Sequence, residues 1–108
     1  MTSFSADYLK SVHDHSFKNK EEISKSVDCY CFHCFKIYAS NEIEYYLSEN
    51  DGKETALCPY CLCDTVIGDA CGIELTNELI DALAYEYLHY LTRDDMKGFE
   101  RPEIVELD

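Results

Sequence analysis

Two pairs of cysteines place the strongest constraint on how this chain can fold. One pair lies in Cys31-Phe32-His33-Cys34 and the other in Cys58-Pro59-Tyr60-Cys61, with residues 35–57 between them. A Cys-x-x-Cys segment presents two thiols to one side of an ion, so two such segments supply the four ligands of a tetrahedral site. Four sulfur ligands in a non-redox setting favour Zn²⁺. The pattern therefore predicts a closed structural zinc site at Cys31, Cys34, Cys58 and Cys61, with no open position for catalysis.

Two further cysteines flank these pairs. Cys29 precedes the first pair and Cys63 follows the second, so the clusters read CxCxxC and CxxCxC. Residues two apart on a strand share a face, so both thiols could approach the metal. We expect them to be packing residues or spare thiols, and a second metal or sulfur-bridged cluster is the alternative. We expect Cys71 to be unrelated to the metal and His33 to point to solvent.

The cysteine count also bears on the cellular compartment. The 108-residue chain has seven cysteines, an odd number. Residues 1–7 have neither the basic nor the apolar region of a signal peptide, and the chain has no run of 18 apolar residues that could span a membrane. These features predict a cytoplasmic protein whose thiols stay reduced and are held by metal.

The charge of the chain limits its partners. The formal net charge is −13, and the lysines and arginines are not clustered. Binding to nucleic acid needs clustered cations that neutralise phosphates, so we expect neither nucleic acid nor an anionic membrane as a partner. The acidity favours another protein, with a basic or neutral surface, as the partner. An alternative is that the acidic chain mimics nucleic acid and thereby inhibits a nucleic-acid-binding protein.

The hydrophobic pattern predicts an α+β fold. Apolar spacing and capping residues predict helices over 4–12, 19–26, 41–49 and 77–91, the last an amphipathic helix capped by Thr76. β-Branched and alternating segments predict strands over 27–31, 35–38, 54–57 and 62–67. We expect residues 1–93 to form one domain, in which a zinc-ribbon β core is flanked by N-terminal helices and covered by the helix at 77–91. Residues 94–108 form an acidic tail.

Two enzymatic interpretations are less well supported by the sequence than a structural zinc site. A thiol-disulfide oxidoreductase using Cys58 and Cys61 needs its first cysteine at a helix N-terminus, where the dipole lowers the thiol pKa. Here a strand and loop follow the pair. His13 and His15 flank Asp14 well before the first cysteine pair, where solvated or capping roles are more common than catalysis. We therefore expect a non-enzymatic protein.

Residues 13–91 resemble a group of small uncharacterised bacterial cytoplasmic proteins. The strings that carry this resemblance are Cys31-Phe32-His33-Cys34, Ser40-Asn41-Glu42-Ile43, Ala56-Leu57-Cys58-Pro59-Tyr60-Cys61 and Asp64-Thr65-Val66-Ile67-Gly68. The resemblance implies a rubredoxin-like zinc-ribbon core and a bacterial origin, and it carries no activity to transfer. The leading hypothesis is a zinc-stabilised protein that binds another protein, with Tyr85 and Tyr90 outside the buried helix stripe as candidate contacts.

Overall fold

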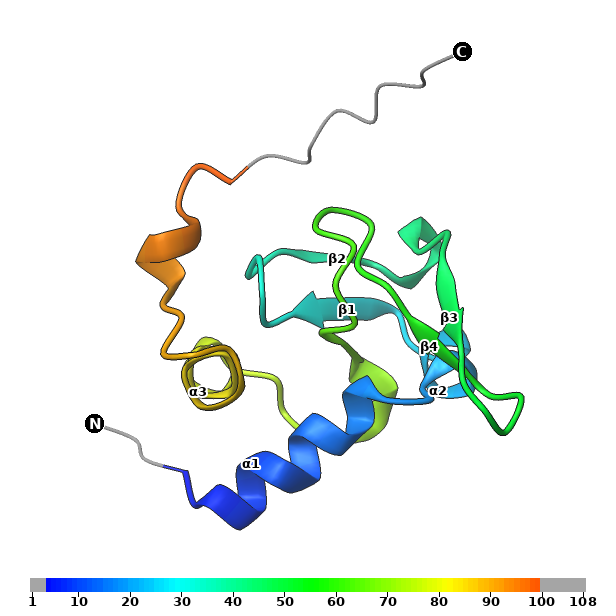
Figure 1. Ribbon diagram of the computed structural model, residues 1–108, viewed down its shortest axis with the longest axis horizontal. Helices are drawn as coiled ribbons and strands as arrows, with labels where there is room; N and C mark the ends of the chain where they lie inside the picture. Colours follow the sequence, from blue (N-terminus) through cyan, green and yellow to red (C-terminus); the bar gives the residue numbers. More distant parts are fainter. Residues whose placement is uncertain (1–3, 100–108) are drawn as a thin grey trace.

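Two small antiparallel sheets carry the cysteine pairs, and helices lie around them (Figure 1). The computed structural model describes residues 4–99. A three-stranded sheet has the order β2-β1-β5, and a two-stranded sheet pairs β3 with β4. The strands are β1 (Asp28–Cys31), β2 (Ile37–Ala39), β3 (Tyr46–Ser48), β4 (Glu54–Ala56) and β5 (Val66–Gly68). The described residues therefore form the α+β fold that the sequence predicts.

The central strand β1 fixes the position of the first cysteine pair. In its register, Cys29 lies opposite Tyr38 of β2 and Gly68 of β5, and Cys31 lies opposite Val66. Alternate residues of a strand share a face, and Cys29 and Cys31 are both fully buried. The strand thus delivers Cys31 to the interior at the point where the chain leaves the sheet.

Two helices precede the sheet. Helix α1 (Ala6–His13) begins at Ser5, whose hydroxyl accepts a hydrogen bond from the Tyr8 N–H at 3.1 Å, and it buries Leu9 and Val12. The short helix α2 (Lys20–Ser24) follows. Asn19 precedes α2, but its side chain does not cap the helix. It instead links distant segments by donating to the Val66 carbonyl and accepting from the Ala56 N–H.

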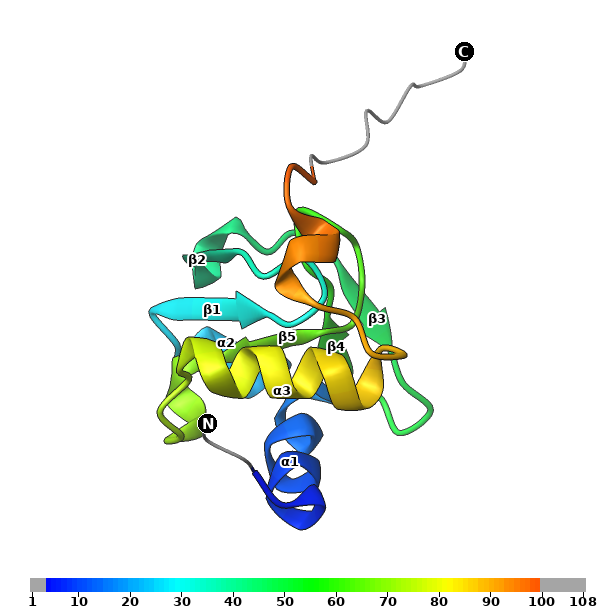
Figure 2. The ribbon, with the colours of Figure 1, turned by 90° about the vertical axis from the view of Figure 1, so that its left-hand side faces the viewer.

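Helix α3 (Asn77–Tyr87) packs against the three-stranded sheet (Figure 2). Thr76 caps it as predicted, since its hydroxyl accepts from the Leu79 N–H at 3.2 Å. Leu79, Ile80 and Leu83 are buried in a cluster with residues of α1 and the sheet. The helix ends before the predicted residue 91 because His89 and Tyr90 adopt positive φ values of 53° and 65°. That left-handed conformation is incompatible with continuing an α-helix.

The predicted helix at 41–49 is wrong. A single 3₁₀ turn (Ser40–Glu42) is followed by strand β3, and Ile43 is buried whereas Leu47 is exposed. The hydroxyl of Ser40 donates to the Ser26 carbonyl at 2.6 Å and caps no helix. Pairing with β4 across the turn at 50–53 satisfies the backbone of β3 and overrides the helical spacing.

Other segments differ less from prediction. The strand expected over 62–67 is confined to β5, because residues 62–65 have no regular secondary structure. Of the predicted tail, residues 94–99 are described: Arg93–Met96 form a 3₁₀ turn, and Met96 and Phe99 pack on the buried cysteine cluster. Residues 100–108 lie outside the described part. No helix within residues 4–99 has the length and apolar character that crossing a membrane requires.

Candidate metal centre

The first cysteine pair forms a tight turn at the end of β1, which we call knuckle 1 (residues 31–36). The Cys31 N–H donates to the Lys36 carbonyl at 3.1 Å, and the Phe35 N–H donates to the Cys31 carbonyl at 3.0 Å. Phe35 has a φ of 62°. The backbone N–H groups of His33 and Cys34 point at the Cys31 sulfur, at 3.3 and 3.5 Å. Such donors favour the thiolate over the thiol.

The second pair repeats this backbone arrangement in knuckle 2 (residues 58–63), between β4 and β5. The Cys58 N–H donates to the Cys63 carbonyl, and the Leu62 N–H donates to the Cys58 carbonyl, both at 2.9 Å. Leu62 has a φ of 62°, the same as its counterpart in knuckle 1. The Tyr60 N–H lies 3.4 Å from the Cys58 sulfur. Two segments far apart in sequence therefore adopt one local structure.

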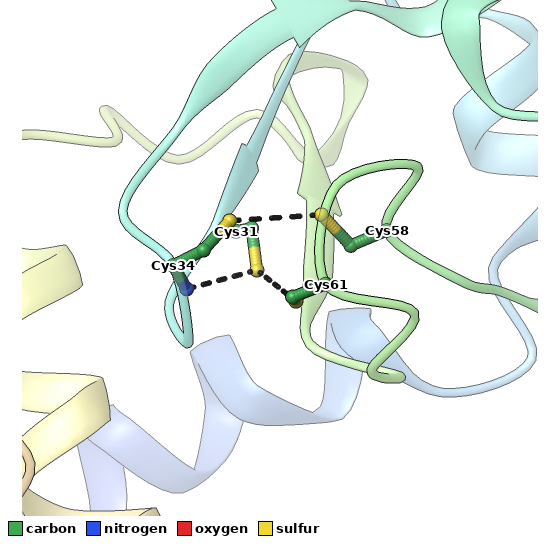
Figure 3. Close-up of side chains that lie close together, drawn as sticks. All are labelled: Cys31, Cys34, Cys58 and Cys61. Atoms are coloured by element: carbon green, nitrogen blue, oxygen red, sulfur yellow. Dashed lines mark hydrogen bonds between the residues drawn. The ribbon is translucent and has the colours of Figure 1, made fainter. Parts of the chain in front are cut away.

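The two knuckles face each other and bring their four sulfur atoms together (Figure 3). The Cys31 and Cys61 sulfurs are 3.6 Å apart, and those of Cys34 and Cys58 are 3.7 Å apart. Zn–S bonds of about 2.3 Å at tetrahedral angles separate the sulfurs by about 3.8 Å. All seven cysteines are free of disulfides. The two measured distances match this spacing, all four sulfurs lie within 4.8 Å of one another, and the cluster could hold a metal ion.

The buried surroundings of the four-cysteine cluster disfavour thiolates whose negative charge is not neutralised by a cation. Cys31 and Cys58 are fully buried, and Cys34 nearly so. Burial raises the pKa of the Cys31 thiol, whereas hydrogen bonds from the neighbouring sulfurs lower the pKa of Cys58. Hydrogen bonding within the cluster raises the pKa of Cys61. The thiols therefore cannot all ionise unless a cation neutralises them, which is the condition that a bound metal ion meets.

Thr65 belongs to this environment, although sequence reasoning treated it only as a β-branched strand residue. Its buried hydroxyl oxygen lies 3.0 Å from the Cys31 sulfur. A hydroxyl at this distance can donate to a thiolate and orient the ligand. No spacing rule links Thr65 to Cys31, because the contact arises only from the pairing of β1 with β5.

The other three cysteines, Cys29, Cys63 and Cys71, have different environments. Cys29 is buried in the sheet and belongs to neither cluster of potential metal ligands among the described residues. Burial raises the pKa of its thiol to about 12. Cys71 is half-buried and likewise lies outside both clusters. Cys63, by contrast, lies with His33 and Cys61 in a second cluster. His33, expected to point to solvent, is only partly exposed, and its Nδ1 atom is buried.

The two N-terminal histidines do not converge on one site. The His15 Nδ1 atom lies 2.9 Å from Glu22 Oε1. The His13 ring instead stacks on Tyr87, with 3.9 Å between ring centroids. Asp14 pairs with Lys10 at 3.5 Å. Each of these side chains therefore has its own local partner.

The surroundings of Cys58 differ from those of a catalytic thiol. Knuckle 2 is a turn between two strands, and no helix of residues 4–99 begins at Cys58. The dipole that lowers the pKa of a redox-active first cysteine is thus not supplied by a helix here.

Comparisons of the chain with protein-family models, with curated proteins and with solved structures find no match.

Proposed function

We propose that Cys31, Cys34, Cys58 and Cys61 bind one structural Zn²⁺ ion that fastens knuckle 1 to knuckle 2 in a rubredoxin-like zinc ribbon. The observation that carries this proposal is the pair of sulfur–sulfur distances, 3.6 and 3.7 Å, between cysteines of opposite knuckles. Four soft donors with N–H groups aimed at the sulfurs suit Zn²⁺, whose structural sites are closed and four-coordinate. The ion compensates the buried thiolates and closes the core.

Elemental analysis of the full-length protein tests this proposal directly. We expect bound zinc in the wild type and its loss in Cys34→Ser. Cys71→Ser is the matched control, since Cys71 is a half-buried cysteine outside the cluster, and it should keep the zinc. A wild-type protein without metal, or a Cys34→Ser variant with unchanged zinc, would contradict the proposal.

We further propose that the zinc-ordered domain serves to bind a basic segment of another protein, without catalysis. Tyr85 and Tyr90 support this, because they are 53% and 71% exposed and their rings lie 5.0 Å apart. Tyr85 also lines a hollow that contains Asp94, together with Asp81, whose carboxylate pairs with Arg93 at 2.8 Å. Exposed tyrosines beside carboxylates suit a cationic partner, as does the net charge of −13.

The interaction is tested by affinity capture with quantitative comparison between variants. A specific partner should bind the wild type, be lost with Tyr85→Ala/Tyr90→Ala, and dissociate as salt rises. Tyr45→Ala removes a comparably exposed tyrosine elsewhere and should leave the binding unchanged. If every captured protein is retained by the double variant, this surface is not the binding site.

A further inference from the structure

A second group of potential metal ligands lies beside the four-cysteine cluster. It consists of His33, Cys61 and Cys63, whose ligand atoms all lie within 4.8 Å of one another. One imidazole and two thiols are donors that zinc and similar thiophilic ions accept. Cys61 belongs to both groups, so the two potential sites are adjacent and share one sulfur.

The shared fold of the knuckles explains why these residues meet. Leu62, with its positive φ, turns the chain back after Cys61, and the Cys63 carbonyl is held by the Cys58 N–H. The Cys63 sulfur then lies 3.7 Å from the Cys61 carbonyl oxygen, on the same side of the turn. His33 comes from the opposite knuckle. The group is therefore assembled by the same packing that assembles the four-cysteine cluster.

His33 provides an independent observation. Its Nδ1 atom is buried and has no hydrogen-bond partner within the described part of the chain, although the side chain itself is only partly buried. Leaving a buried polar atom unpaired is costly, so native structures rarely tolerate one without a ligand or water. A neutral imidazole nitrogen is a common metal ligand. An ion bound through Nδ1 would give this nitrogen a partner.

We propose that His33, Cys61 and Cys63 bind a second thiophilic divalent ion, with the Cys61 thiolate bridging the two ions. This inference rests on the proposed four-cysteine zinc site, because the two sites share Cys61. Three protein ligands leave one position of a tetrahedral ion open, whereas the four-cysteine site has none. The second ion is therefore the more exchangeable one, and an external ligand can complete its coordination.

Native mass spectrometry of the full-length protein, equilibrated with Zn²⁺ and then desalted, counts the ions directly. We expect two ions per wild-type chain and one in both His33→Asn and Cys63→Ser. Cys71→Ser and His89→Asn, which alter a cysteine and a histidine outside the second group, should keep two. On titration of the wild type with a chromogenic zinc chelator, one ion should leave before the other. His33→Asn leaves every four-cysteine ligand intact, so it also answers the question if Cys63→Ser misfolds.

The possible outcomes distinguish the second metal site from the four-cysteine zinc site on which it rests. A wild-type chain with no ion overturns both the four-cysteine site and the second site. A wild-type chain with one ion keeps the four-cysteine site and overturns the second. Two ions that persist in His33→Asn and Cys63→Ser would place the extra ion elsewhere and also overturn the inference.

Discussion

Knuckles 1 and 2 have the same backbone hydrogen bonds and the same positive φ, yet they are anchored by different forces. In knuckle 1, Phe32 is 1% exposed and packs with Leu79 and Leu83 of α3. In knuckle 2, the position equivalent to Phe32 is the buried Pro59. The half-buried Tyr60 beside it packs against Tyr38 in the other core cluster, and its hydroxyl donates to Glu42 at 2.7 Å. The comparison shows that one local backbone structure can pack against two different parts of the core, with a polar contact added in knuckle 2.

The surroundings of the Cys31 and Cys58 sulfurs also differ, and Cys31 has more supporting contacts. The Cys31 sulfur has the Thr65 hydroxyl beside it in addition to two backbone N–H groups. Cys58 follows a short strand of the smaller sheet, whereas Cys31 ends the central strand of the larger one. Knuckle 1 should therefore keep more of its structure without metal, and knuckle 2 should depend on the ion.

Removal of the metal is expected to have the largest effect. Structural zinc contributes an apparent binding free energy of about 10–16 kcal/mol in small zinc domains, where binding is coupled to folding. Chelation, or Cys31→Ser, should unfold the central region, as measured by circular dichroism and thermal melting. Hydrogen exchange during a graded chelator titration should show residues 58–63 losing protection before β1.

Two results would contradict this expectation. Unchanged melting without metal would remove the ion as a source of stability. Loss of protection in β1 and residues 58–63 at the same chelator concentration would show that the knuckles unfold as one unit. Their different anchors would then have no energetic consequence.

Truncating the apolar anchor of knuckle 1 should have the next largest effect. Phe32→Ala removes a fully buried aromatic ring, which typically costs about 3–5 kcal/mol. Tyr60→Phe, in knuckle 2, loses the hydrogen bond to Glu42 and should cost about 1 kcal/mol. Denaturant unfolding of the zinc-loaded protein measures both. Equal losses of unfolding free energy in Phe32→Ala and Tyr60→Phe would mean that the core beneath α3 supports the two knuckles equally.

The sequence predicts which four cysteines come together, but it predicts their surroundings poorly, for physical reasons. Cys-x-x-Cys spacing is a local constraint, so Cys31, Cys34, Cys58 and Cys61 could be selected from the sequence and are brought together in space. The contact of Thr65 with Cys31 depends on strand pairing, and His33 comes near Cys61 and Cys63 only because the two knuckles pack together. Such long-range relations have no local signature.

The secondary structure shows the same division. The helix around Leu79 is signalled by its own apolar stripe and by the Thr76 cap, and it forms. Residues 41–49 also have helical spacing, but Tyr46 and Leu47 find strand partners in β4. Pairing with a neighbouring strand decided the outcome there, as it often does for short segments with weak local preference.

Each knuckle contains one residue with a positive φ, Phe35 or Leu62. We predict that replacing these two residues by glycine changes the stability of the protein in opposite directions. A non-glycine residue in the left-handed region is strained by about 1–2 kcal/mol. Leu62 is 41% exposed, so Leu62→Gly should relieve more strain than it loses in packing, and stabilise the protein by about 0.5–1 kcal/mol. Phe35 packs against the α3 cluster and under Arg93, 4.8 Å away, so Phe35→Gly should destabilise. Denaturant midpoints measure both signs, and a shared sign would contradict the difference in anchoring.

The smallest expected effect is a pH dependence confined to the support of knuckle 1. His13 stacks on Tyr87 and lies 5.8 Å from the Phe32 ring, and burial lowers its pKa below 6.5, although Asp14 and Asp64 partly oppose the shift. The unfolded chain therefore takes up the proton first as pH falls. Stability from this group is complete above about pH 6.5 and declines as pH falls through the lower folded-state pKa.

Acid also releases metal by protonating thiolates, so only a difference between chains isolates His13. His13→Gln should lose less melting temperature than the wild type between about pH 7 and 5, because glutamine binds no proton in this range. Hydrogen exchange at the lower pH should place the extra opening of the wild type in α1 and knuckle 1, and not in residues 58–63. An identical decline in both chains would show that the packing beneath knuckle 1 does not respond to the charge of His13.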